Sequence, residues 1–211
     1  FGRCSVTVAL PIISQMKVQC CPVLTSVFSN HTGYPSFYFD DYTEKMPSYI
    51  AEWKKLNLHF ECIAAGFLGS ERQIEIVKNF IRDFKDETTK VLIDPVMGDH
   101  GRTYQTFTPE MCSQMKQLAH FADILTPNLT EACILTDTPY HDGHWQMSEL
   151  SELALSLIAM GPSKVVITGV SMGTFIGNLI CELGGIDYVV KRKRVGKERY
   201  GTGDIFDEIL T

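Results

Sequence analysis

Short apolar runs rich in strand-forming residues alternate with amphipathic helical patterns along most of the chain. This alternation is typical of repeated βα units packed around a mainly parallel sheet. The sequence therefore predicts an α/β fold. The predicted strands are Gln19–Val27, Cys62–Phe67, Lys90–Asp94, Ala122–Thr126 and Lys164–Thr168. The predicted helices are Ser5–Met16, Thr43–Leu56, Glu71–Phe84, Pro109–Ala119, Leu129–Leu135 and Met147–Met160.

The pattern changes after Thr168. Two apolar stretches, Thr174–Glu182 and Ile186–Val190, are separated by Leu183, Gly184 and Gly185. Glycines in a short connection between two such runs are typical of an antiparallel hairpin. We therefore expect a small β-hairpin flap appended to the parallel sheet.

The composition indicates one domain and limits its partners. With 211 residues, 45% of them hydrophobic, the chain can bury one substantial core, and no linker or repeat divides it. The net charge of −6 and the lack of a long uncharged apolar run argue against nucleic-acid and membrane partners. Seven scattered cysteines without a Cys-x-x-Cys pair indicate reduced thiols in a cytoplasmic protein. The abrupt ends indicate a single domain over 1–211 that lacks a first strand and C-terminal helices.

The segment Tyr200–Phe206 carries the most chemical information, because a turn of small residues leads into a helix-compatible apolar run. Glycines let the backbone approach a phosphate, and the N–H groups at a helix N-terminus point toward it. The backbone of Gly201, Thr202 and Gly203 can therefore hold the charge of a transferring phosphoryl group. Asp204 can accept the proton of an attacking hydroxyl. Taken alone, the segment fits an ordinary glycine turn with Asp204 as helix N-cap equally well.

A second motif, Asp94-Pro95-Val96-Met97-Gly98-Asp99, follows a predicted strand at its carboxyl end, where open α/β sheets bind ligands. It resembles the Asp-Pro-Val-Met/Leu-Gly motif of pyridoxal kinases in the ribokinase superfamily. Ser29-Asn30-His31-Thr32-Gly33-Tyr34 is similar to their substrate-side loop, and Thr126-Pro127-Asn128 with Glu131 is similar to their Thr-Pro-Asn-x-x-Glu motif. Gly201 to Asp204 matches their Gly-Thr-Gly-Asp turn. The loop of residues 29–34 points to vitamin B6 kinases rather than sugar kinases.

The resemblance implies a ribokinase-like three-layer α/β/α fold that uses MgATP to phosphorylate the 5′-hydroxymethyl group of pyridoxal, pyridoxine or pyridoxamine. It implies that Asp204 is the base, with Gly201, Thr202 and Gly203 as the anion hole. The substrate-binding residues implied are His31, Thr32, Gly33, Phe67 and Asp204. A homodimer is also implied, and whether a monovalent cation such as K⁺ takes part stays open.

On the nucleotide side, the resemblance implies that Asp94 and Glu131 act around Mg²⁺ and the ATP phosphates, partly through water. Asp99, Thr126, Thr168 and Gly203 would border the nucleotide. Each residue also has a simpler interpretation. Asp94 can be a turn residue at a strand end, Glu131 a helix N-terminal acid and Asp99 part of a solvated turn, while both threonines suit β-strands. The two threonines are expected to end strands at the same edge of the sheet.

Some features depart from the family or suggest other functions. Many pyridoxal kinases have a hydroxyl-bearing aromatic after the glycine at Gly66, whereas Phe67 cannot donate a hydrogen bond. We interpret the basic run Lys191–Arg194, with Lys197 and Arg199, as a solvated flap strand with one side chain near the phosphates, not as a nucleic-acid surface. A hydroxymethylpyrimidine (phosphate) kinase is the nearest alternative, although that family usually has cysteine in place of Asp204. A non-catalytic B6-binding protein is the other.

Overall fold

The computed structural model describes residues 1–31, 34–196 and 201–211. Its helices are α1 (Val6–Gln15), α2 (Met46–Lys55), α3 (Glu71–Phe84), α4 (Pro109–Ala119), α5 (Leu129–Thr136), α6 (Met147–Ile158) and α7 (Thr202–Leu210). Its strands are β1 (Ser26–Phe28), β2 (Phe39–Asp41), β3 (Cys62–Ala65), β4 (Lys90–Ile93), β5 (Gly98–Asp99), β6 (Arg102–Thr103), β7 (Ile124–Leu125), β8 (Lys164–Met172), β9 (Phe175–Glu182) and β10 (Tyr188–Lys193).

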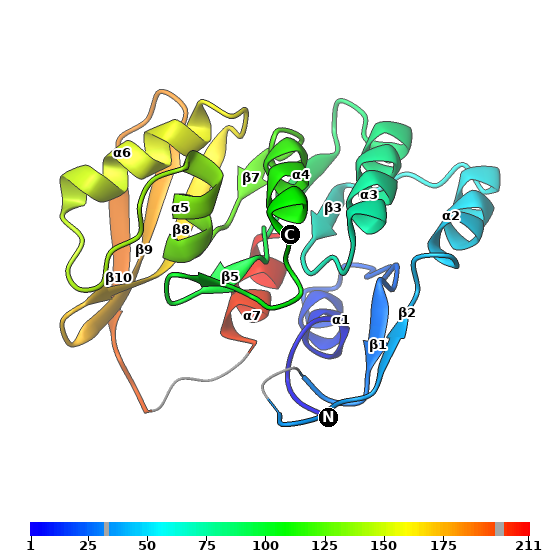
Figure 1. Cartoon of the computed structure of the whole chain (residues 1–211). Helices are drawn as coiled ribbons and strands as arrows, with labels where there is room; N and C mark the ends of the chain where they lie inside the picture. Colours follow the sequence, from blue (N-terminus) through cyan, green and yellow to red (C-terminus); the bar gives the residue numbers. More distant parts are fainter. Residues whose placement is uncertain (32–33, 197–200) are drawn as a thin grey trace.

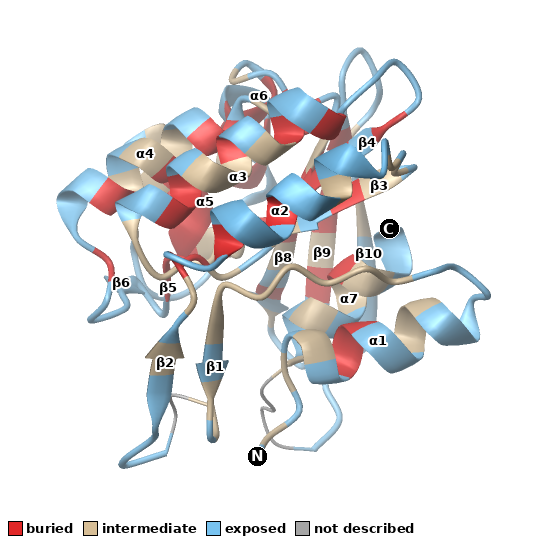
Figure 2. Cartoon of the chain, turned by 90° about the vertical axis from the view of Figure 1, so that its right-hand side faces the viewer, coloured by how far each residue is buried: buried red, intermediate tan, exposed pale blue. Residues whose placement is uncertain are grey.

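The central sheet has the order β10-β9-β8-β7-β4-β3. Strands β3, β4, β7 and β8 are parallel, whereas β9 and β10 continue the sheet antiparallel to their neighbours. Helices α2 to α6 cover one face, and α1 and α7 pack side by side on the other (Figures 1 and 2). The predicted three-layer α/β/α fold is therefore confirmed.

Local sequence signals explain where the covering helices begin. The side chain of Ser70 accepts a hydrogen bond from the N–H of Gln73 at the start of α3, and Thr108 caps α4 in the same way. Along α3, Ile74 and Ile81 recur at helical spacing and are fully buried against the sheet. Capping and amphipathic spacing thus fix α3 and α4 at the predicted boundaries.

The centre of the sheet is buried on both faces, as expected for parallel strands covered by helices. In β4, Val91, Leu92 and Ile93 are at most 1% exposed, and Leu125 of β7 is fully buried. The backbone of Thr126 extends this pairing, because its N–H donates to the carbonyl of Ile93 at 3.0 Å. The polar residues that follow β4 and β7 therefore emerge at one edge of a rigid sheet.

Two strand predictions were wrong in part. Only the end of Gln19–Val27 is a strand: β1 pairs with β2 in a separate small hairpin, and Pro22 cannot donate to a ladder. The predicted hairpin appended to the parallel sheet is confirmed as β9–β10, which joins that sheet where β9 pairs with β8. Thr168 does not end its strand, because β8 continues to Met172 past a register shift between Ile167 and Val170.

Candidate active site

A cavity of about 2530 Å³ lies along the carboxyl ends of β4 and β7 and reaches the N-termini of α1 and α7. All the predicted site residues that the structure describes line this cavity. They are His31, Phe67, Asp94, Asp99, Thr126, Glu131, Thr168, Gly201, Thr202, Gly203 and Asp204. Thr32 and Gly33, which were expected to contact the pyridine ring, fall outside the described residues. Residues far apart in the sequence therefore meet at one site.

The turn before α7 requires glycine at its first position. Gly201 is the helix N-cap and has φ 78°, in the left-handed region, and a Cβ there would lie 1.8 Å from the carbonyl oxygen of Arg3. Thr202 and Gly203 follow in the first helical turn and line the cavity. Their backbone N–H groups belong to the positive end of the α7 dipole. Asp204 is the third helical residue, so the simpler interpretation of it as the N-cap is wrong.

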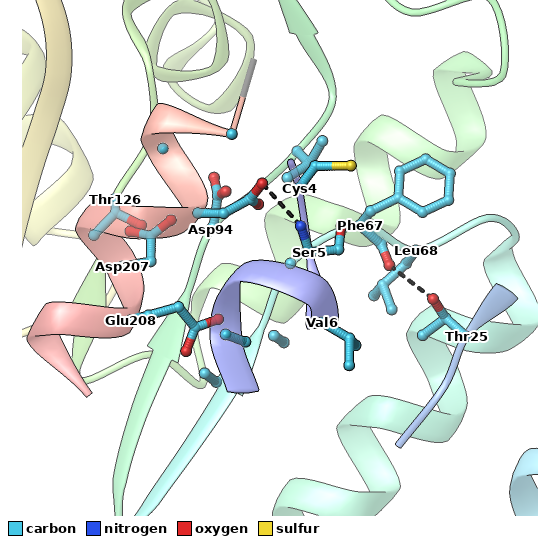
Figure 3. A pocket seen from close by; sticks show the side chains of 18 of the residues that line it. Cys4, Ser5, Val6, Thr25, Phe67, Leu68, Asp94, Thr126, Asp207 and Glu208 are labelled. Carbon is cyan, nitrogen blue, oxygen red and sulfur yellow. Dashed lines mark hydrogen bonds between the residues drawn. The ribbon is translucent and has the colours of Figure 1, made fainter. Parts of the chain in front are cut away.

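The N-terminal part of the chain holds Asp204. The N–H of Ser5, which precedes α1, donates to Oδ2 of Asp204 at 3.0 Å (Figure 3). Ser5 has φ 50°, so this contact is made by a non-glycine residue in the left-handed region. The bond engages one carboxylate oxygen and fixes the direction of the group at the cavity wall. The other oxygen can then meet a ligand hydroxyl.

A cluster of acidic side chains lies where β4 meets α7 (Figure 3). Asp207, one turn after Asp204, is 7% exposed, and its side chain lies beside Thr126 and Asp94. Burial raises the pKa of Asp207. Burial, followed by the charges of Glu131 and Asp207, raises the pKa of Asp94. Sequence analysis missed Asp207, although an acid three residues after Asp204 on one helix shares its face.

Glu131 serves the local fold as well as the cavity. It forms a capping box with Asn128 at the start of α5, where Oε2 accepts the N–H of Asn128 at 2.8 Å. Oε1 accepts the N–H of Met97 at 3.0 Å. Burial raises the pKa of Glu131, and these backbone hydrogen bonds act in the opposite direction. Glu131 thus ties the loop after β4 to α5, as the simpler interpretation of a helix N-terminal acid expects.

The remaining nucleotide-side candidates differ in exposure. Thr126 is 2% exposed, and the N–H of Thr168 donates to the carbonyl of Pro127 at 2.9 Å, so both lie beside the same loop. Asp99 is exposed on the small β5–β6 hairpin, and its Oδ2 lies 3.6 Å from Nε2 of His100. From the basic run, Lys193 and Arg194 line the cavity, whereas Lys197 and Arg199 fall outside the described residues.

Aromatic residues form the opposite wall. Phe67 is half-buried and meets the edge of Phe28, with ring centroids 6.0 Å apart. The carbonyl of Phe67 accepts a hydrogen bond from the hydroxyl of Thr25 at 3.2 Å, which fixes the loop after β3. The ring of His31 packs against Tyr34 at 4.6 Å between centroids. A flat ring can stack on this wall, while the acidic cluster lies across the cavity.

Comparisons with known proteins agree with this geometry. The family model for phosphomethylpyrimidine kinases matches residues 10–211. The chain belongs to the phosphomethylpyrimidine kinase family. The pyridoxal kinase of Arabidopsis thaliana is 31% identical over 161 residues, which cover 72% of this chain and 49% of that protein. The chain therefore spans about half the length of this relative of the family.

Solved structures extend the comparison to the fold. A candidate phosphomethylpyrimidine kinase from Bacteroides thetaiotaomicron, in a crystal form with pyridoxal, has 42% identity and a TM-score of 0.94, covering 99% of this chain and 74% of that chain. Pyridoxal kinase from Lactobacillus plantarum has 28% identity and a TM-score of 0.89, covering 100% of this chain and 76% of that chain. The predicted resemblance to pyridoxal kinases and the ribokinase-like fold are confirmed.

The family implies a Mg²⁺ ion, and the residues of the site fit one. Among the described residues, no three His, Cys, Asp or Glu side chains are grouped as a complete metal site. Mg²⁺, however, usually takes one or two carboxylates, with water and substrate phosphates as its other ligands. Asp94 and Asp207 provide two adjacent carboxyl groups, and Oδ1 of Asp207 is buried without a described hydrogen-bond partner. These residues fit a Mg²⁺ ion that arrives with a nucleotide.

Proposed function

We propose that the protein transfers the γ-phosphoryl group of MgATP to the 5′-hydroxymethyl group of pyridoxal, pyridoxine or pyridoxamine, a step of vitamin B6 salvage. The observation that carries the proposal is the position of Asp204. It lies in the first turn of α7, is held by Ser5, and lines one cavity with the acidic cluster and the aromatic wall. The family and a related structure that holds pyridoxal add support.

In this proposal the chain acts mainly by positioning and charge stabilisation, because phosphoryl transfer needs little covalent help from protein. Asp204 accepts the proton of the substrate hydroxyl as the oxygen attacks. The N–H groups of Gly201, Thr202 and Gly203 hold the transferring phosphoryl oxygens. His31, Thr32, Gly33 and Phe67 bind the pyridine ring.

On the nucleotide side, we propose that Asp94 holds Mg²⁺, with Glu131 acting through water because both its oxygens already accept backbone N–H groups. The ion, when bound, neutralises charge on the phosphates. Asp99, Thr126, Thr168 and Gly203 border the nucleotide in this proposal. A requirement for K⁺ is tested by replacing K⁺ with Na⁺ in the assay.

The second candidate is a hydroxymethylpyrimidine or hydroxymethylpyrimidine-phosphate kinase, which the matching family description favours. Both substrates present a hydroxymethyl group on a flat heteroaromatic ring, so the same base and anion hole can serve either. Asp204 favours the B6 substrates, since the pyrimidine kinases that this chain resembles usually have cysteine at that position. The two functions therefore differ in acceptor but not in chemistry.

The test measures ATP consumption by the purified protein with Mg²⁺ and four acceptors in parallel: pyridoxal, pyridoxine, pyridoxamine and hydroxymethylpyrimidine. Turnover on a B6 vitamer that falls by about 100-fold or more in Asp204→Asn, with ligand binding retained by calorimetry, supports the kinase and its base. Turnover on the pyrimidine alone overturns the substrate. Ligand binding without turnover on any acceptor favours the non-catalytic binding protein.

Two further parts of the proposal concern the whole protein. A homodimer is proposed from the family resemblance, and light scattering during gel filtration tests it. A cytoplasmic location is proposed because the seven cysteines are all unpaired, as in reducing compartments. In the part of the chain that the structure describes, no helix is both long and apolar enough to cross a membrane.

A further inference from the structure

The junction of β4 and α7 concentrates acidic side chains, among the residues that the structure describes. The charged groups with the largest effects on the Asp94 carboxyl are the acids Glu131, Asp207 and Asp204. Asp204 and Glu208 act on Asp207 in the same way. Like charges in a poorly solvated site repel one another strongly. Such a site is stable only with bound protons or with a bound cation.

Asp207 shows which atom lacks a partner. The residue is 7% exposed, and its Oδ1 has no hydrogen-bond donor among the residues that the structure describes. Asp207 and Asp94 are neighbours in this cluster, and two ionised carboxylates cannot donate hydrogen bonds to each other. A buried carboxylate oxygen without a donor is costly. A cation bound at this atom would remove that cost.

The position of Asp207 suits a cation that enters with a ligand. Its side chain lines the same cavity as the first turn of α7, one helical turn from Asp204. Figure 3 shows Asp207, Thr126 and Asp94 together beside the end of that helix. A hard divalent cation at this place would meet two carboxylate oxygens and could take its other ligands from water and phosphates.

We propose that Asp207 is a direct ligand of the divalent cation that accompanies the nucleotide, and that it shares this ion with Asp94. The identity of the ion, Mg²⁺, rests on the proposed kinase function. Asp207 lies outside the sequence motifs that suggested Asp94 and Glu131. Its role follows from packing α7 across the end of β4.

The experiment titrates the purified protein with Mn²⁺, as a spectroscopic substitute for Mg²⁺, and measures free Mn²⁺ by electron paramagnetic resonance. Titrations are run alone and with a non-hydrolysable ATP analogue. Asp207→Asn should raise the dissociation constant at least tenfold. Glu208→Gln is the matched control, because it removes the same charge from the next residue of α7 and should change the constant less than twofold. Equal effects of the two variants, or no effect of Asp207→Asn, would overturn the proposal.

The effect of Mg²⁺ on the melting temperature provides a second readout. Asp207→Asn would not change this effect if Asp207 had a purely structural role. The rise in melting temperature that Mg²⁺ causes in wild type should be lost. If Asp207→Asn fails to fold, Asp207→Ala replaces it in both measurements. An undiminished Mg²⁺-dependent rise would contradict the proposal.

The acceptor assay separates this inference from the proposed function. Vitamer turnover by wild type with unchanged Mn²⁺ binding in Asp207→Asn refutes the ligand role and leaves the kinase function in place. Mn²⁺ binding that depends on Asp207, in a wild-type protein without turnover, supports the cation site and counts against the kinase function.

Discussion

Replacing Gly201 with alanine should damage both stability and turnover. The substitution places a Cβ 1.8 Å from the carbonyl oxygen of Arg3 at a residue with φ 78°. A left-handed backbone costs alanine roughly 1–2 kcal/mol. Moving the segment of Arg3 away also breaks the bond from Ser5 to Asp204, and a hydrogen bond to a charged group contributes roughly 1.5–3 kcal/mol. Because the Ser5–Asp204 bond is exposed to solvent, the lower ends of these ranges apply, and together the losses amount to about 3 kcal/mol.

For a chain of this length, a loss of that size lowers the melting temperature by about 6–12 °C. Because Asp204 loses its anchor, kcat should fall about 100-fold, as expected when a catalytic group moves by about 1 Å. The assay combines thermal unfolding with vitamer turnover. The stability control is Gly203→Ala, since a Cβ at Gly203 meets nothing within 4 Å, and this variant should be more stable by about 0.4–1 kcal/mol. Equal melting temperatures for the two variants would refute the steric reasoning, and normal kcat in Gly201→Ala would refute the role of the Ser5 contact.

Three other predictions follow from single contacts. Phe67→Tyr supplies the hydroxyl that the resemblance to pyridoxal kinases leads one to expect at this position. A hydrogen bond of about 0.5–1.5 kcal/mol should lower KM for pyridoxal several-fold with little change in kcat, measured by steady-state kinetics; an unchanged KM would contradict it. Glu131→Gln puts an amide donor where two backbone N–H groups need acceptors. The free energy of unfolding, measured with urea, should therefore fall by about 1–3 kcal/mol. Wild-type stability in this variant would argue against these two hydrogen bonds. The pKa of Asp86 is lowered to about 2, chiefly by the Thr88 side-chain hydroxyl and then its backbone N–H. Its contribution to stability is therefore complete above the unfolded pKa near 3.9 and is lost as the pH falls through about 2. Asp86→Asn should flatten the decline in unfolding midpoint between about pH 4 and 2, and an unaltered slope there would exclude this assignment.

Local signals allowed much of the fold to be predicted. The boundaries of α3 and α4 match because their caps, Ser70 and Thr108, are encoded within one turn of each helix. The prediction of a strand over Gln19–Val27 failed for most of its length. Its apolar composition suits a strand, but strand pairing depends on whether the fold places another strand beside it. The prediction that Thr168 ends its strand failed because a β-strand can continue past a register shift, which composition does not reveal.

The candidate site also combines residues that could be predicted from the sequence with contacts that could not. That Asp94, Glu131 and Asp204 line one cavity could be predicted because each belongs to a short motif with its own chemistry. Oδ1 of Asp207 becomes buried without a hydrogen-bond partner only when α7 packs across the end of β4. The hydrogen bond from Ser5 to Asp204 joins residues 199 positions apart in the sequence. Contacts of this kind depend on tertiary packing, so local sequence patterns do not predict them.

The Ser5–Asp204 bond also bears on how the molecule folds. Its two residues are 199 positions apart in the sequence, so they meet only after the long intervening loop has closed. The sheet and the helices α2 to α6 can form from contacts that lie much nearer in sequence. During refolding, helical signal should therefore recover before turnover does, and a partly folded chain would lack an oriented base. Catalytic activity in this protein would then report on the last long-range contacts to form.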